Sequence, residues 1–105
     1  MNEREYERKL KTKIRARFPG CHIMKNDASY TQGIPDILIL FNNHWAMLEV
    51  KMDYGSEHQP NQDYYVEHFN NMSFCSFINP QNEEDVLCAL QSAFGLEGSS
   101  RVSQS

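Results

Sequence analysis

The chain has 105 residues, of which 40% are hydrophobic, and its formal net charge is −4. This length favours one domain with a modest core, and because no apolar run reaches 18 residues, a transmembrane helix is excluded. The charged N-terminus lacks the apolar stretch of a secretory signal, so we expect a cytoplasmic protein whose three cysteines stay reduced.

The charge is divided unevenly along the sequence. Residues 1–25 hold eight of the ten basic residues against three acidic ones, a net charge of +5. The remaining residues hold two basic and eleven acidic ones, a net charge of −9. This asymmetry indicates a basic surface for a polyanion, although a solvated helix face would look the same.

The N-terminal quarter predicts a helix, a short strand and a loop. Over residues 2–18, Tyr6, Leu10, Ile14 and Phe18 recur every fourth residue and form one apolar stripe, which ends at Pro19-Gly20. Residues 21–25 then suit a short strand, and the polar residues 26–34 suit a loop.

The middle of the chain predicts a hairpin. Residues 36–41 are an apolar run behind one acid, as in a strand that is buried on both faces. Asn42-Asn43 is typical of a tight turn, and residues 44–51 form the return strand. A polar loop, residues 52–60, follows.

The last third predicts a helix that begins at residue 60 or 61 and ends near residue 69, a strand over residues 73–78, and a helix over residues 82–94. The element order is therefore α-β-β-β-α-β-α, which favours an α/β fold around a mixed sheet. We expect a single domain over residues 1–95 and a disordered tail over residues 96–105.

The hairpin also predicts a site. A two-residue turn at residues 42–43 pairs residues whose numbers sum to 85, and Asp36 and Glu49 satisfy this rule. Two opposed carboxylates repel each other unless a cation lies between them, and hard oxygen ligands select Mg²⁺ or Mn²⁺. Lys51 projects from the same face as Glu49, and the backbone carbonyl of Val50 is a candidate third ligand.

Two carboxylates, a lysine and a divalent cation suit phosphodiester hydrolysis, since a metal polarises the phosphate and activates water. The competing interpretation is that Glu49 and Lys51 form an exposed ion pair on an edge strand.

A wider set of residues has the same order and compatible spacing as a known motif: Glu7, Lys25, Gly33-Ile34-Pro35-Asp36, Glu49-Val50-Lys51 and Gln62. This pattern resembles the VRR-NUC family of the PD-(D/E)XK nuclease superfamily, whose small stand-alone members are often encoded by phages. The resemblance covers residues 3–94. It implies a restriction-endonuclease-like core, in which a central mixed four-stranded sheet is flanked by helices.

The resemblance also implies roles. Asp36, Glu49 and the Val50 carbonyl would bind metal, Lys51 would be catalytic, and Glu7 and Gln62 would be auxiliary. Two alternatives stay open: Glu3 lies one helical turn from Glu7, and Gln59 competes with Gln62.

The expected function is a Mg²⁺- or Mn²⁺-dependent endonuclease that cuts branched or Holliday-junction DNA, acts as a homodimer, and works in the cytoplasm of the host if a phage encodes it. Phosphate contacts are expected from the basic residues Arg4, Arg8, Lys11, Arg15 and Lys25. The alternatives are a non-catalytic nucleic-acid-binding module with the same fold, and an accessory subunit that docks through the acidic C-terminal half.

Overall fold

The computed structural model describes residues 1–96. Its elements follow the predicted order, with bounds within three residues of those expected from the sequence: α1 (Glu3–Arg17), β1 (His22–Lys25), β2 (Ile37–Phe41), β3 (His44–Val50), α2 (Gln62–Met72), β4 (Phe74–Ile78) and α3 (Glu83–Ala93). The largest difference is at the end of α2, which continues through residue 72, three residues beyond the end that the sequence predicted.

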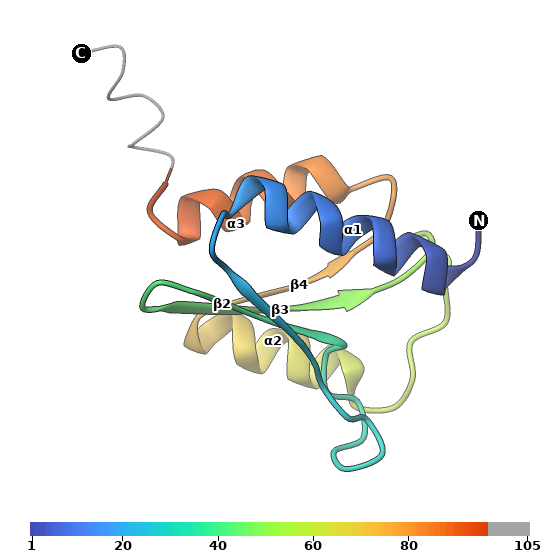
Figure 1. Ribbon diagram of the computed structural model, residues 1–105. Coiled ribbons are helices and arrows are strands. Elements are labelled where there is room, and N and C mark those ends of the chain that lie inside the picture. Colours follow the sequence, from blue (N-terminus) through green and yellow to red (C-terminus); the bar gives the residue numbers. More distant parts are fainter. Residues whose placement is uncertain (97–105) are drawn as a thin grey trace.

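The strands form one sheet in the order β1-β2-β3-β4. The β1–β2 and β2–β3 pairs are antiparallel, and the β3–β4 pair is parallel, so the predicted mixed four-stranded α/β fold is confirmed. Helices α1 and α3 cover one face of the sheet and α2 covers the other (Figure 1). Two parallel neighbouring strands need a long crossover connection, and α2 is the helix of that connection between β3 and β4.

The main core lies between the sheet and the α1–α3 layer. The predicted stripe of α1 is buried, with Leu10, Ile14 and Phe18 fully inaccessible to solvent. Phe18 packs edge-on against Phe41 and Phe94, at ring-centroid distances of 5.7 and 5.3 Å. Burial of this apolar surface fixes α1 on the sheet, and with it the basic residues that α1 carries.

Two backbone positions shape the site. Asn42 takes a positive φ of 55° in the hairpin turn, a conformation that asparagine tolerates. Gly33 has a φ of +89°, and a Cβ atom there would lie 2.6 Å from the Cβ of Asn61. The loop before Asp36 therefore packs directly against the start of α2, in a way that only glycine allows.

Leu96 packs against the core, and the rest of the expected tail, residues 97–105, lies outside the described residues. Within residues 1–96, no helix combines the length and the apolar character needed to cross a bilayer.

Candidate active site

The β2–β3 hairpin has the register that its turn predicts. In each of the five pairs, from Phe41 and His44 to Ile37 and Leu48, the two residue numbers sum to 85. Asp36 directly precedes β2, so a continuation of this register would pair it with Glu49. Glu49 lies on the α2 side, where it contacts Gln62, and the Asp36 carboxylate lies at the end of the hairpin, between the Val50 N–H and Lys25.

Asp36 is held by backbone groups on both sides. Its Oδ2 accepts a hydrogen bond of 2.9 Å from the backbone N–H of Val50. The side chain of Asn26 donates to the carbonyl of Pro35, and the N–H of Asn26 donates to the carbonyl of Asp36. The second carboxylate oxygen, Oδ1, lies 3.9 Å from the amine of Lys25. One oxygen of Asp36 is therefore fixed, while the other faces a cation that is half exposed.

Glu49 is only 3% exposed. Its Oε2 accepts a hydrogen bond of 2.9 Å from the side-chain amide of Gln62. Its Oε1 is buried and has no hydrogen-bond partner in the described part of the chain. Burial, followed by the negative charge of Asp36, raises the pKa of Glu49 well above its usual range. Oε1 of Glu49, which lies beside a second carboxylate, therefore has neither a hydrogen-bond donor nor a cation in contact with it within residues 1–96.

Lys51 completes what we call the buried cluster, made of Glu49, Lys51 and Gln62. The amine of Lys51 donates to the side-chain oxygen of Gln62 at 2.8 Å and to the backbone carbonyl of Glu57 at 2.9 Å. It lies 3.8 Å from Oε2 of Glu49. An ammonium group has three N–H donors, so one remains for another acceptor.

The structure distinguishes the two candidate glutamines. Gln62, the first residue of α2, contacts both Glu49 and Lys51, and its side-chain oxygen also accepts the backbone N–H of Gln59 at 2.8 Å. Gln59 thus reaches the cluster through its backbone only. The Glu57 carbonyl was not predicted, because the polar loop 52–60 does not show in its sequence which backbone group will turn inward.

The two candidate glutamates of α1 lie in different surroundings. Glu7 accepts from Lys25 at 2.7 Å and lies 3.2 Å from Lys11. Partial burial opposes the ionisation of Glu7, but these hydrogen bonds outweigh it and lower its pKa. Partial burial and then the negative charge of Asp36 raise the pKa of Glu3. Glu7 is therefore neutralised by lysines, whereas Glu3 adds negative charge near Asp36.

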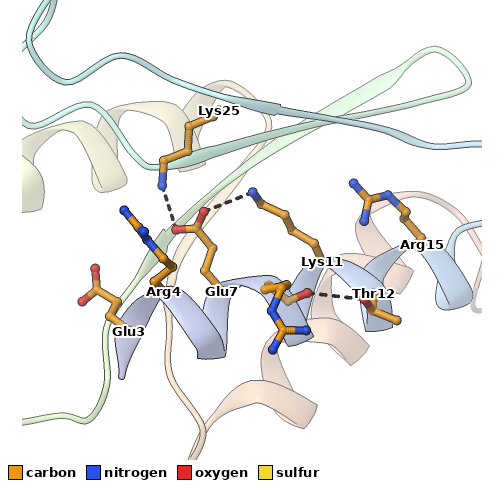
Figure 2. Close-up of a pocket in the computed structure, with 8 residues that line it drawn as sticks. Glu3, Arg4, Glu7, Lys11, Thr12, Arg15 and Lys25 are labelled. Atoms are coloured by element: carbon orange, nitrogen blue, oxygen red, sulfur yellow. Dashed lines mark hydrogen bonds and ion pairs between the residues drawn. The ribbon is translucent and has the colours of Figure 1, made fainter. Parts of the chain in front are cut away.

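A surface groove of about 700 Å³ runs along α1 and the end of β1. We call it the basic groove. In Figure 2, Lys25 and Lys11 extend toward Glu7, and Arg15 lies further along the helix. The groove brings together the five basic residues predicted to contact phosphates: Arg4, Arg8, Lys11, Arg15 and Lys25.

The residues present fit a divalent cation only with help from the backbone. No group of three or more His, Cys, Asp or Glu side chains within residues 1–96 is placed to hold a metal. Asp36 and Glu49 provide two carboxylates, one of them with an orphaned oxygen. The N–H and C=O of one residue point to the same side of an extended strand, so the Val50 carbonyl is expected to face Asp36, as the Val50 N–H does.

A solved structure has a similar fold. A "VRR_NUC domain protein" superposes with a TM-score of 0.61 at 15% sequence identity, and the match covers 89% of this chain and 90% of that chain. The fold is that of a VRR_NUC domain. This result confirms the fold expected from the sequence resemblance. Neither a protein-family model nor a curated protein sequence matches the chain.

This fold explains why candidate site residues that are far apart in the sequence lie close together in space. The hairpin carries Asp36 and Glu49 on neighbouring strands, and the crossover between β3 and β4 brings the first turn of α2, with Gln62, over them. Helix α1 brings its basic face to the end of β1, where Lys25 lies between Glu7 and Asp36.

Proposed function

We propose that this protein is a metal-dependent endonuclease that hydrolyses phosphodiester bonds in DNA. The observation that carries the proposal is the orphaned Oε1 of Glu49, which is buried beside Asp36, while the other oxygen of the same carboxylate, Oε2, lies 3.8 Å from the Lys51 amine. A buried carboxylate oxygen with no hydrogen-bond donor, next to a second carboxylate, is costly unless a further cation compensates it. A purely structural ion pair would not require Asp36 at the next step of the register.

In this proposal Asp36, Glu49 and the Val50 carbonyl hold Mg²⁺ or Mn²⁺. When bound, the ion polarises the phosphate and lowers the pKa of a water molecule. Oxygen ligands and two negative charges are the donor set that such hard cations prefer.

The protein's own contribution is to position groups around the phosphate. In hydrolysis the water oxygen bonds to phosphorus, the bond from phosphorus to one sugar oxygen breaks, and that sugar oxygen leaves with a proton. The third N–H of Lys51 is free to orient the water or to stabilise charge on the phosphate, because Gln62 and Glu57 hold the other two. Gln62 keeps Lys51 and Glu49 in place, and either Glu7 or Glu3 is auxiliary.

DNA is proposed to enter along the basic groove. Arg4, Arg8, Lys11, Arg15 and Lys25 supply the phosphate contacts, and Lys25 connects the groove to the site through its 3.9 Å approach to Asp36. Phosphate contacts of this kind hold any sequence alike, so the groove offers affinity without base specificity.

The proposed substrate is branched or Holliday-junction DNA, which a homodimer of the chain would cut. The proposed location is the cytoplasm, that of the host cell if a phage encodes the protein. A domain of this size offers little surface for a branched substrate, and two copies would present two grooves and two sites. The three cysteines are unpaired thiols, which is the usual condition in a reducing compartment.

The test is to incubate the purified chain with duplex, flap and four-way-junction DNA in Mg²⁺, Mn²⁺ or EDTA. We expect cleavage of the branched DNA with either ion and none in EDTA. Sedimentation of the protein with junction DNA checks the dimer. Salt-dependent binding without any cleavage would identify a non-catalytic binding module, and the absence of both would refute a nucleic-acid function.

A further inference from the structure

A second cavity lies on the β4 side of the sheet, whereas the basic groove lies at its β1 edge. It has a volume of about 340 Å³ and is bounded by the loop after β3, by α2, and by β4 with the turn that follows it. Lys51 lies on its wall. The volume is within the range of small-molecule sites, at the lower end, which suits a single ring system and not a peptide or a duplex.

The wall nearest the cluster is aromatic. Phe77 of β4 is the register partner of Glu49, so it lies on the neighbouring strand directly beside that carboxylate. The ring of His58 stacks on Phe77 at a centroid distance of 4.2 Å and an interplanar angle of 21°. Tyr54 also lines the cavity, and its side chain is 71% exposed. Because His58 and Phe77 each cover one face of the other, a planar ligand would meet the exposed ring of Tyr54 and the outer side of the stacked pair.

The wall also carries a positioned hydrogen-bond donor. Asn79 is only 3% exposed, and its Oδ1 accepts the backbone N–H groups of Gln81 and Asn82 at 2.8 Å each. This contact fixes which way the amide points. The Nδ2 of Asn79 makes no hydrogen bond within residues 1–96, and it is not sealed off from solvent. It is therefore available to an acceptor in the cavity.

The charge of this cavity differs from that of the basic groove. Five of the groove's lining residues are lysines or arginines, whereas the only lysine of the cavity, Lys51, already donates to Glu57 and Gln62. The carboxylate of Asp53 also lines the cavity. Such a wall is unsuited to phosphate, and it favours a flat, uncharged group that carries a hydrogen-bond acceptor.

We propose that this cavity binds an unpaired nucleobase of the nucleotide next to the scissile phosphate. The proposal rests on the proposed function, and it adds the form of the substrate: a base that is free of its duplex partner, as at a branch point or in a single strand. A stacked and paired base cannot reach a pocket of this kind. The base would stack against Tyr54 or the outer side of the His58–Phe77 pair, and the Nδ2 of Asn79 would donate to one of its acceptors.

The test measures binding of two single strands by fluorescence anisotropy, with Ca²⁺ present and strand integrity checked on a gel. One strand is an octathymidylate, and the other has the same backbone with every base removed. We expect the wild-type chain to bind the octathymidylate about tenfold more tightly, since stacking of one base on an aromatic ring contributes an effect of this order. Phe77→Leu should abolish the preference.

Phe69→Leu is the matched control. Phe69 is also a half-buried aromatic residue that stacks on a neighbouring ring, but it faces Trp45 and Tyr65 and does not line the cavity. This variant should keep the preference. Tyr54→Ala changes an exposed side chain, so it should leave the melting temperature unchanged and reduce the preference.

The outcomes separate the two proposals. Equal affinity of the wild-type chain for both strands would refute the base pocket and leave the groove and the nuclease proposal standing. A preference that survives in both Phe77→Leu and Tyr54→Ala would also refute the pocket. If neither strand binds at low salt, both the pocket and the proposed function fail.

Discussion

The buried cluster and the basic groove use carboxylates and amines in opposite ways. In the buried cluster, Glu49, Lys51 and Gln62 are at most 9% exposed, and each is held by a direct hydrogen bond. In the groove, the Lys25 side chain that pairs with Glu7 is 52% exposed. Water and salt screen the second kind of pair but hardly the first.

The difference indicates a division of labour. A preorganised, poorly solvated group acts strongly on charge that develops next to it, which suits chemistry at one atom. An exposed set of cations acts weakly at each residue but over a longer range, which suits attraction of a polyanion. Asp36 lies where the two regions meet, with one oxygen on the Val50 N–H and the other near Lys25.

Lys51→Ala is expected to have the largest effect on cleavage. We expect cleavage to slow by about 10²–10³-fold, the usual effect of losing one positioned donor to transition-state charge. The same change at Lys11, in the groove, should weaken DNA binding with little effect on the maximal rate. Single-turnover cleavage at saturating DNA measures this contrast. If the two variants slow the rate equally, the buried cluster has no special role.

Reversal of charge in the groove is expected to have the next largest effect. Changing Arg8, Lys11 and Arg15 to Glu should weaken binding of all DNA sequences alike and make it less dependent on salt. The log–log slope should fall by roughly 0.9 for each duplex phosphate that the protein no longer neutralises. Filter binding at several salt concentrations measures both quantities.

The matched control for the groove uses two neighbouring positions. Arg8 lines the groove, whereas Lys9 is exposed but does not. Arg8→Glu should therefore weaken binding more than Lys9→Glu does, although both change the net charge by the same amount. Equal losses would mean that only net charge matters and that the DNA path does not follow the groove.

Metal linkage tests the carboxylate pair. A cation that binds only the folded state stabilises it by about 2.7 kcal/mol at 100 times its Kd. We expect Mn²⁺ to raise the wild-type melting temperature relative to EDTA, and Lys51→Ala to keep most of that gain. Asp36→Asn should lose the gain, yet melt higher than wild type in EDTA, because it removes the repulsion with Glu49. A wild-type chain that gains nothing from Mn²⁺ would contradict the proposed metal site.

Gly33 tests how the loop before Asp36 is tied to α2. Gly33→Ala imposes an unfavourable φ and also a contact of 2.6 Å with Asn61, so it should destabilise the fold by about 1–3 kcal/mol or more. Gly20→Ala is the control, since its φ is +90° and nothing lies within 4 Å of the new atom. The difference in the free energy of unfolding between the two variants isolates the contact. Identical losses would show that only backbone strain matters.

The smallest expected effect concerns thiol reactivity beside the buried cluster. Burial, and then the negative charge of Glu49, raise the pKa of Cys75 to about 12, whereas Cys88 is exposed. Because the thiolate is the reactive form, iodoacetamide at pH 8 should modify Cys88 first and Cys75 only on unfolding. Mass spectrometry of the modified peptides reads the order. Early labelling of Cys75 would contradict the burial of this side of the sheet.

Features that depend on local periodicity could be predicted from the amino-acid sequence. The four-residue spacing of Tyr6, Leu10, Ile14 and Phe18 predicted the buried face of α1, because an amphipathic helix has one apolar stripe. The two-residue turn at residues 42–43 predicted the register of the hairpin, and hence the relation of Asp36 to Glu49, because side chains alternate with a period of two. These relations need no information from distant residues.

Contacts between residues that loops bring together could not be predicted from the sequence. Gln62 contacts Glu49 and Lys51, while Gln59 offers only its backbone; Glu7 pairs with Lys25, while Glu3 faces the charge of Asp36. The Glu57 carbonyl on Lys51 and the stacking of His58 on Phe77 beside the cavity had no signal in the sequence. A loop of about nine residues, such as residues 52–60, can close in many ways at similar entropic cost. Packing against α2 and β4, and not the composition of the loop, therefore sets its path.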